Sequence, residues 1–297
     1  MPTIKSIDGL MGSLRKRLYI AERGLATSIF LAYKLGRPLF LEGEAGVGKT
    51  EVAKTMADIF GTELIRLQCY EGLDVHHAVY DWNYTRQMMN IRLVESRGEH
   101  ITEAELFGRE YLLQRPLLQA IEESQDHQVV LLVDEIDRSD EEFEAFLLEV
   151  LSDFQITIPE IGTIKTDHPP FVVITSNRTR EVHDALKRRC LYFWINYPSF
   201  EKEYEIVQTK VPQASTNLAR QVTAFVQELR QVDLYKIPGV AETLDWTSAL
   251  VALDQKALDP DLVEETLGLI LKYQDDIEKI TNDHLITIMG RVQARVG

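Results

Sequence analysis

Short apolar runs and segments of helical period alternate over the first two thirds of this chain. Five runs have the length and composition of strands. They are Pro38–Glu42, Glu63–Cys69, Val129–Val133, Phe171–Thr175 and Leu191–Ile195. Because helix-period segments separate these runs, the pattern predicts an α/β domain with a parallel sheet flanked by helices.

Helical spacing identifies several of the intervening segments. Leu18, Leu25 and Ile29 belong to a three- and four-residue spacing that Gly36 and Pro38 end, which predicts an N-terminal helix. Further helices are predicted over Lys49–Phe60 and Pro116–Glu123, and after the capping-box patterns Thr102-x-x-Glu105 and Ser139-x-x-Glu142.

The pattern changes after Pro198, where helical period continues to the end of the chain. The helices predicted there are Phe200–Val211, Leu218–Val232, Thr243–Leu253, Leu262–Tyr273 and Asp283–Gln293. We therefore expect a first domain over 1–198 and a helical domain over 199–297. Within the first, 70–115 is a mixed polar insertion and 154–166 a hairpin.

A complete phosphate-loop pattern stands between the first predicted strand and the helix after it. The segment Gly43-Glu44-Ala45-Gly46-Val47-Gly48-Lys49-Thr50 matches G-x-x-x-x-G-K-[ST]. Its glycines allow backbone N–H groups to surround phosphates. Lys49 would reach the β- and γ-phosphates, and the Thr50 hydroxyl would ligate Mg²⁺. We expect all eight residues to bind the nucleotide.

Two carboxylates end the apolar run Val129–Val133. Asp134 and Glu135 would lie at the carboxyl edge of a parallel sheet, where ligands of such sheets bind. Asp134 is expected to hold the metal, through water, and Glu135 to polarise the attacking water. The alternative is a buried strand followed by an acidic turn, which the phosphate loop makes the weaker interpretation.

The run Phe171–Thr175 also ends in polar residues. Asn177 is a candidate to orient the lytic water or to bind the γ-phosphate, and its alternative role is a helix N-cap. Arg188 and Arg189 end a predicted helix, where bases also suit the helix dipole. We favour Arg189, ahead of Arg188, as an arginine finger that reaches nucleotide on a neighbouring subunit.

Net charge and composition limit the classes of molecule that this chain is expected to bind. The 297 residues contain 47 acidic and 32 basic side chains, for a net charge of −15. Such a chain is repelled by phosphate backbones, so nucleic acid is disfavoured as the main partner. The two cysteines form no metal or disulfide framework, and neither a signal peptide nor a membrane span is recognisable. These features favour a cytoplasmic protein without stable membrane insertion.

The phosphate loop, the Asp134-Glu135 pair, Asn177 and the Arg188-Arg189 pair, in this order and before a helical domain, resemble the AAA+ ATPases. The insertion and the hairpin resemble the MoxR branch of that family. Non-catalytic strings resemble its CoxD-like members, which are linked to carbon monoxide dehydrogenase maturation. These strings are Leu67–Gly72, Asp81–Tyr84 and Val240–Trp246. The resemblance implies ATP as the nucleotide and a ring, usually a hexamer. It also implies a von Willebrand factor A (VWA) domain partner and a metalloenzyme client, such as a molybdenum hydroxylase.

One position departs from the MoxR pattern. Thr243 stands where members carry a lid arginine, the second sensor, and Arg220, Arg230 and Lys236 are candidates by residue type to replace it. The predicted function is therefore an ATP-hydrolysing remodelling chaperone. The alternative is a nucleic-acid motor or loader, which the net charge opposes.

A histidine pair, an acidic stretch and two aromatic residues are expected to have structural roles or to contact protein. His76-His77 is expected in a solvated polar loop, and the acidic stretch Asp137–Glu144 at a solvated helix start. Trp82 and Tyr84 could stack on a base, but insert packing or contacts to a protein substrate suit an acidic chain better.

Overall fold

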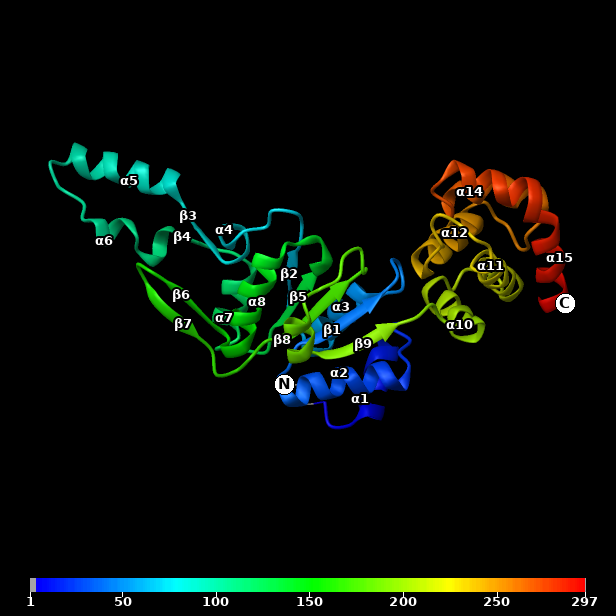
Figure 1. The fold of residues 1–297 in the computed structure, drawn as a ribbon, viewed down its shortest axis with the longest axis horizontal. Coiled ribbons are helices and arrows are strands. Elements are labelled where there is room, and N and C mark those ends of the chain that lie inside the picture. Colours follow the sequence, from blue (N-terminus) through cyan, green and yellow to red (C-terminus); the bar gives the residue numbers. More distant parts are fainter. Residues whose placement is uncertain (1–3, 297) are drawn as a thin grey trace. The chain divides into compact units, whose positions relative to one another are not determined.

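Five strands form the central sheet, in the order β2-β5-β8-β1-β9 (Figure 1). The computed structural model describes residues 4–296. The strands are β1 (Leu39–Gly43), β2 (Leu64–Gln68), β5 (Val130–Asp134), β8 (Phe171–Ser176) and β9 (Leu191–Ile195). The pairs β2–β5, β5–β8 and β8–β1 are parallel. The predicted parallel sheet is confirmed, and each apolar run supplies one strand.

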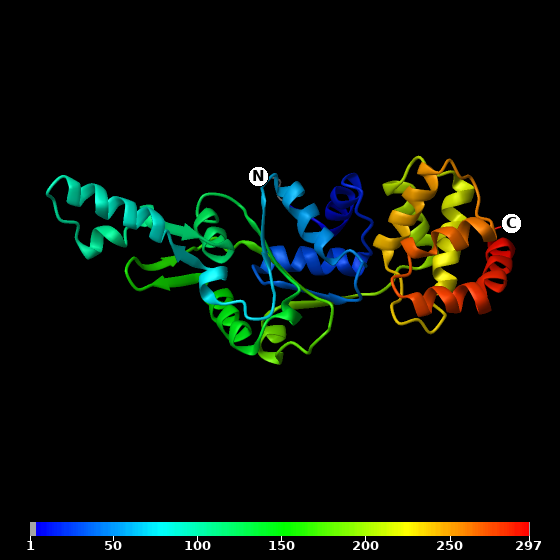
Figure 2. The ribbon, with the colours of Figure 1, turned by 90° about the horizontal axis from the view of Figure 1, so that it is seen from above.

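Helices cover both faces of this sheet (Figures 1 and 2). They include α2 (Arg23–Leu35), α3 (Lys49–Phe60), α7 (Pro116–Glu123) and α8 (Glu141–Asp153). Leu131 and Ile174 lie in one apolar cluster with side chains of α7 and α8. Phe171 instead contacts Phe60 of α3, with ring centroids 6.0 Å apart, and Phe60 contacts Tyr33 of α2. Successive side chains of a strand point to opposite faces, so both faces are buried.

The elements that follow β5 and β8 bring polar residues to one edge of the sheet. A 3-10 turn, η2 (Ile136–Arg138), follows β5, and the short helix α9 (Asp184–Arg189) lies between β8 and β9. The predicted hairpin is confirmed as the antiparallel pair β6 (Gln155–Ile158) and β7 (Gly162–Lys165).

The insertion has its own small sheet and helices. In chain order its elements are α4 (Val75–Ala78), β3 (Tyr80–Trp82), α5 (Tyr84–Ser96), α6 (Glu103–Leu106), η1 (Arg109–Tyr111) and β4 (Leu112–Gln114). β3 and β4 pair antiparallel, which returns the chain to α7 after the helices. Trp82 is buried and packs edge-on against Phe107, with ring centroids 5.1 Å apart.

The predicted N-terminal helix starts later than expected and is preceded by another helix. The prediction begins at Leu18, but Leu18 has a φ of 60° and lies between α1 (Ile7–Lys16) and α2. A leucine in this left-handed conformation cannot continue a helix. The apolar spacing from Leu25 onward is that of α2, whereas α1 was not predicted.

One of the two predicted capping boxes forms. Glu105 accepts from the backbone N–H of Thr102 at 2.8 Å, and the Thr102 hydroxyl accepts from the N–H of Glu105 at 3.3 Å. The Ser139 prediction is wrong, because its hydroxyl donates to the Ile136 carbonyl at 2.8 Å and closes η2. Asp140 caps α8 instead and accepts from the N–H of Phe143 at 2.8 Å.

The chain separates into two compact units. The first contains Arg23–Glu42 and Thr50–Trp194, with the N-terminal segment up to Leu10. The second contains Met11–Glu22, Gly43–Lys49 and the chain from Ile195 onward. The phosphate loop therefore belongs to the second unit by its contacts, although β1 and α3 on either side belong largely to the first.

The second unit is helical. Its elements are α10 (Phe200–Lys210), α11 (Thr216–Leu229), α12 (Val240–Ala252), α13 (Pro260–Thr266), η3 (Leu267–Leu269), α14 (Gln274–Lys279), the π-helical turn η4 (Ile280–His284) and α15 (Leu285–Val296). Trp246 is fully buried in its core. The predicted helix Leu262–Tyr273 is wrong at its end, because the α-helix stops at Thr266 and tightens around Gly268, a poor helix former.

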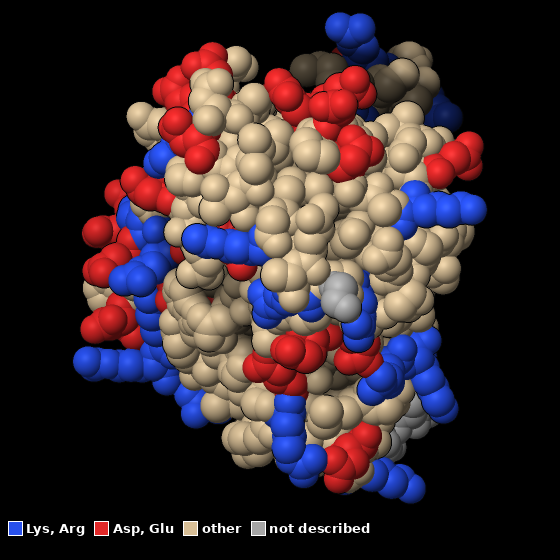
Figure 3. Space-filling model, turned by 90° about the vertical axis from the view of Figure 1, so that its right-hand side faces the viewer, with Lys and Arg blue, Asp and Glu red and all other residues tan. Residues whose placement is uncertain are grey.

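Figure 3 shows a face of the helical second unit. Acidic and basic side chains are interspersed on this face around a broad area of other residues. A groove that binds a nucleic-acid backbone would instead concentrate lysine and arginine side chains. Within 4–296, every helix is too short or too polar to span a bilayer.

Candidate functional site

The phosphate loop joins β1 to α3, as its pattern requires. Gly43 is the last residue of β1 and Lys49 the first of α3. Lys49 is only 7% exposed, and its ammonium donates to the carbonyls of Gly43 at 2.8 Å and Glu44 at 2.7 Å. A buried ammonium needs such partners. The loop backbone therefore surrounds the Lys49 ammonium, the group predicted to bind phosphate.

Gly46 lies against the start of α12 within the second unit. Its φ is +75°, and its carbonyl accepts from the N–H of Ala241 at 3.2 Å. A Cβ at Gly46 would lie 2.9 Å from Glu242 Oε2 and 3.3 Å from the Cα of Gly239. The positive φ favours glycine there, and a Cβ would also require the Glu242 side chain to shift. Ala45 and Val47 flank this residue, and Gly48 has a φ of +93°.

Asp134 ends β5 and is bonded to residues far away in sequence. Its Oδ1 accepts from the hydroxyls of Thr50 at 3.0 Å and Thr175 at 2.6 Å. Its Oδ2 accepts from Arg66 of β2, at 3.0 Å from Nε and 2.5 Å from Nη2. The structure thus brings together the two predicted metal-holding residues, Thr50 and Asp134. It adds Thr175 and Arg66, which sequence reasoning missed.

Glu135 stands in a left-handed backbone conformation, with φ 57° and ψ 52°. Such strain in a residue other than glycine concentrates at functional sites. Its carboxylate accepts from Gln68 at 3.0 Å, Arg138 at 3.2 Å and Asn177 at 3.3 Å. Glu135 and Asn177, predicted separately from two strands, are therefore in direct contact.

The loop after β8 is held by buried acids. Asp137 is 3% exposed and accepts from the N–H groups of Asn177 and Thr179. Glu144 is 1% exposed, accepts from the N–H of His183 at 2.7 Å and pairs with Arg180. The prediction of a solvated acidic helix start is thus wrong for Asp137 and Glu144. Their partners lie about 40 positions downstream, where no local pattern indicates them.

The predicted arginine-finger residues lie at the exposed end of α9. Arg189 Nη1 donates to the carbonyl of Leu148 at 3.1 Å. Arg37 donates to the carbonyls of Arg188 at 2.9 Å and Arg189 at 3.1 Å. These bonds satisfy the end of the helix. Both arginine side chains are exposed and remain available to a second molecule.

Glu42, just before the phosphate loop, is a buried carboxylate that the sequence did not single out. It accepts from Tyr192 at 2.8 Å, and Ser176 and Lys187 lie at 3.4 and 3.5 Å. Burial, together with the Glu42 carboxylate, raises the pKa of Tyr192 to about 12. Glu42 thereby connects the end of β1 with the tip of β8 and with α9.

Thr243, at the second-sensor position, is not accessible to solvent. Its side chain is fully buried, and its hydroxyl donates to Glu203 Oε1 at 2.8 Å. Arg230 pairs with both oxygens of Glu203 at 2.7 Å and stacks over Tyr197. Arg230 is therefore a structural partner of Glu203. Of the other candidates, Arg220 lies over the Tyr204 ring, and Lys236 is 3.9 Å from Glu242.

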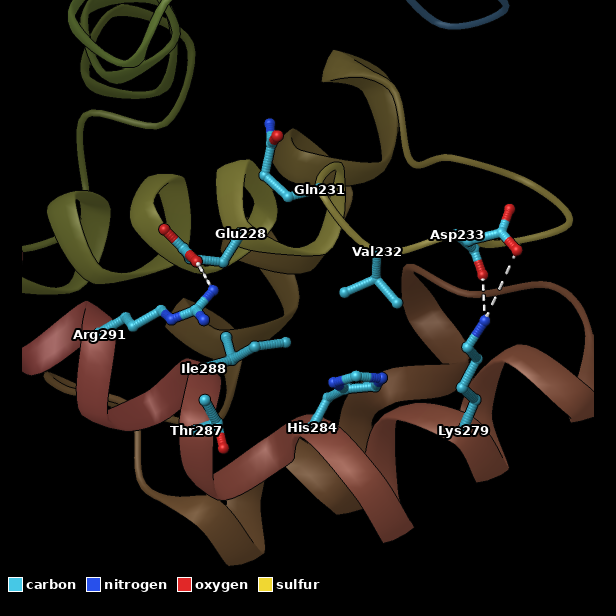
Figure 4. A pocket seen from close by; sticks show the side chains of 9 residues that line it. All are labelled: Glu228, Gln231, Val232, Asp233, Lys279, His284, Thr287, Ile288 and Arg291. Carbon is cyan, nitrogen blue, oxygen red and sulfur yellow. Dashed lines mark hydrogen bonds and ion pairs between the residues drawn. The ribbon is translucent and has the colours of Figure 1, made fainter.

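Neither the His76-His77 pair nor a cavity in the second unit is assigned as a binding site. His77 is exposed and bonded to Asp74 at 2.7 Å, and within residues 4–296 no group of three or more ligating side chains could hold a metal ion. A cavity of about 350 Å³ lies between α11 and α15 of the second unit (Figure 4). Its charges are balanced by the pairs Glu228–Arg291 and Asp233–Lys279.

The residues at the phosphate loop fit a nucleotide and Mg²⁺. Gly43, Gly46 and Gly48 all have positive φ, a backbone conformation that glycine-rich phosphate loops use. The Thr50 hydroxyl and the Asp134 carboxylate are hard oxygen donors, which suit Mg²⁺. Fold and loop together define a P-loop nucleotide-binding protein.

The family follows from comparison with known proteins. Residues 38–190, just over half of the chain, match the AAA domain family (dynein-related subfamily). The chain belongs to this family, and it is an ATPase. An uncharacterized protein of Staphylococcus aureus (strain bovine RF122 / ET3-1) is 23% identical over 205 residues, which cover 67% of this chain and 70% of that protein. Its counterpart in strain USA300 has the same identity and coverage.

Two solved structures are similar at low identity. A candidate ATPase from Cytophaga hutchinsonii has a TM-score of 0.50 and 14% identity, over 98% of this chain and 94% of that one. The RuvB Holliday junction branch migration motor of Thermotoga maritima has a TM-score of 0.45 and 16% identity, over 97% and 84%. The similarity to the Cytophaga hutchinsonii protein is a similarity of fold.

Proposed function

We propose that this ATPase is a remodelling chaperone that acts on a protein client, in the manner of the MoxR branch. The observation that carries the catalytic part is the contact between Glu135 and Asn177, beside the bond between Thr50 and Asp134. These contacts support a site in which Glu135 would activate water, Asn177 would orient it, and Thr50 and Asp134 would hold the metal. This is the set that phosphoryl transfer to water requires.

Each residue has a role in the proposed reaction. ATP supplies the phosphoanhydride, and Mg²⁺ the charge that offsets its oxygens. Lys49 and the backbone of Gly43–Thr50 would bind the phosphates, and Thr50 and Asp134 would hold the metal. Glu135 accepts a proton from water that Asn177 helps to orient. Because the Glu135 side chain is 32% exposed, water can reach its carboxylate.

A protein client is supported by the insertion. Helix α5 exposes four large apolar side chains, Tyr84, Met88, Met89 and Leu93, each more than half exposed. Methionine-rich surfaces adapt to varied protein partners. Trp82, the other aromatic residue considered for base stacking, is buried within the insertion. The insertion therefore offers an apolar contact surface more readily than a nucleobase platform.

The working assembly is proposed to be a ring, usually a hexamer. Arg189 and Arg188 are exposed at the end of α9, where they are available to the nucleotide of a neighbouring subunit. AAA+ proteins commonly work in this way, and the finger would stabilise charge that develops during hydrolysis.

The client is proposed to be a metalloenzyme, such as a molybdenum hydroxylase of the carbon monoxide dehydrogenase type, matured with a VWA-domain partner. This part rests on the CoxD-like strings Leu67–Gly72, Asp81–Tyr84 and Val240–Trp246. The net charge of −15 suits a protein client better than a nucleic acid, and we propose that the protein works in the cytoplasm.

Capture with a trapped variant tests this proposal. Glu135→Gln with ATP and Mg²⁺ should retain its client in a native lysate, whereas Lys49→Ala should not. Recovery of a VWA protein and a metalloenzyme, released when ATP is removed, is the expected result. Nuclease-sensitive recovery of nucleic-acid machinery would overturn the client assignment and favour a nucleic-acid motor.

A further inference from the structure

The metal-holding carboxylate is already paired with a cation of the protein itself. Arg66 Nε and Nη2 lie 3.0 and 2.5 Å from Asp134 Oδ2. The Asp134 side chain is 4% exposed, and that of Arg66 is 50% exposed. A buried carboxylate without a partner is strongly disfavoured. Arg66 therefore supplies the countercharge that Asp134 needs when no metal is bound.

The two oxygens of Asp134 are divided between different donors. Oδ1 accepts from the hydroxyls of Thr50 and Thr175, and Oδ2 accepts two N–H groups of Arg66. Two donors on one carboxylate oxygen use both of its lone pairs, and this holds for each oxygen of Asp134. The donors on Oδ2 are the ones that belong to a half-exposed side chain, which can move away. A metal, or water bound to a metal, cannot share Oδ2 while Arg66 makes both bonds.

Arg66 is placed so that it can leave this bond. It lies on β2, the edge strand of the sheet, at an exposed position of that strand. Its Nη2 also donates to Gln68 Oε1 at 2.5 Å, which gives the guanidinium another partner outside Asp134. The Arg66 side chain is half exposed, so water can solvate the guanidinium once it leaves Asp134.

We propose that Arg66 is a positioning residue that competes with Mg²⁺ for Asp134 Oδ2. It holds the carboxylate in place before metal binds, through the two bonds to Oδ2, and it moves off Oδ2 when metal binds. The inference rests on the proposed function, because it assigns Asp134 to the metal. Two cations that exclude each other from one site weaken each other's binding by the same factor.

Metal affinity tests the competition without any measurement of turnover. The full chain is saturated with ADP, and free Mn²⁺ is followed by electron paramagnetic resonance. Arg66→Gln should bind Mn²⁺ about tenfold more tightly than the wild type, within the usual range of such couplings. Arg66→Lys should lie between the two, because an ammonium makes one point contact in place of the fork.

Arg138→Gln is the matched control. Arg138 pairs with Glu135 at 3.2 Å and is 59% exposed, so this variant removes the same charge near the same site but leaves the Asp134 bonds intact. Its Mn²⁺ affinity should change less than about twofold, as expected for an exposed charge. Equal affinities in Arg66→Gln and Arg138→Gln, or weaker Mn²⁺ binding in Arg66→Gln, would overturn the inference.

Two further measurements separate this inference from folding and from the proposed function. Thermal unfolding of each variant reports whether it folds, and Arg66→Lys keeps the charge if Arg66→Gln does not fold. In an Asp134→Asn background, Arg66→Gln should no longer change Mn²⁺ affinity. A persistent change would overturn the competition. A wild-type chain that binds no ADP would contradict the proposed function, whereas ADP binding with unaltered Mn²⁺ affinity contradicts only the role of Arg66.

Discussion

The Thr50 hydroxyl donates a hydrogen bond of 3.0 Å to Asp134 Oδ1, although 84 positions separate the two residues. Thr50 belongs to the first turn of α3 and Asp134 to the end of β5. Since β1 leads into α3 and is parallel to β8, which pairs with β5, parallel pairing aligns the carboxyl ends of all three strands. The bond places two hard oxygen ligands at the edge where the phosphate loop begins.

Lys49→Ala should abolish nucleotide binding. The Lys49 ammonium is buried against the loop carbonyls of Gly43 and Glu44, so its loss removes the charge at the centre of the loop. We expect ADP affinity, measured by calorimetry, to fall at least about a hundredfold. Lys54→Ala is the control, because Lys54 is exposed on the same helix. Unchanged affinity in Lys49→Ala would remove the phosphate-loop assignment.

Glu135→Gln should bind ATP with nearly normal affinity and hydrolyse it poorly. The amide keeps the size of the side chain and one accepting oxygen, but it cannot accept a proton. General-base catalysis contributes about 10²–10⁴-fold, so kcat should fall by that order. Phosphate release is the measurement, and exposed Glu141→Gln is the control. Normal turnover in Glu135→Gln would show that another group activates water.

Arg189→Ala should inactivate a ring without affecting nucleotide binding, because the finger acts on a neighbouring subunit. Mixed with Glu135→Gln, it should regain activity, since some interfaces then join an intact Glu135 to an intact Arg189. Turnover at varied mixing ratios measures the recovery. A series of mixtures that stays inactive at every ratio would argue against action between subunits.

Thr243→Val should destabilise the helical unit. The Thr243 hydroxyl is buried and lies 2.8 Å from the Glu203 carboxylate, which also pairs with Arg230. Removing the hydroxyl leaves a charged acceptor short of a partner, a cost of about 1–3 kcal/mol. Denaturant unfolding measures it, with Thr243→Ser as the variant that keeps the hydroxyl. If Val is as stable as Ser, the bond to Glu203 contributes little.

Met88→Ser with Met89→Ser should weaken client binding and leave basal ATP hydrolysis unchanged. Both side chains are more than half exposed on α5, so the change should not disturb folding. The measurement is the stimulation of hydrolysis by the captured client. Ile286→Ser, at an exposed position of the second unit, is the control. Equal loss of stimulation in the control would mean that the effect is not specific to α5.

Local patterns determined much of the fold and the identity of the main chemical groups. The helix Lys49–Phe60, the helix Pro116–Glu123 and the strand Leu191–Ile195 have the predicted bounds. The first two begin at a phosphate-loop motif and at a proline, and the third is a continuous apolar run. The insertion was not predictable in this way, since its polar residues follow no single period. Ser139 shows the limit of local motifs, because an adjacent residue, Asp140, made the competing bond.

The sequence by itself singled out the phosphate loop by its motif, and Asp134, Glu135 and Asn177 as candidates because they follow recognisable strands. Only the tertiary structure revealed Arg66 on Asp134, and Asp137 and Glu144 beneath the loop after β8. These partners lie 39 to 68 positions apart. Pairing of β2, β5 and β8 brings them together, and the need of buried carboxylates for donors then decides which side chains meet.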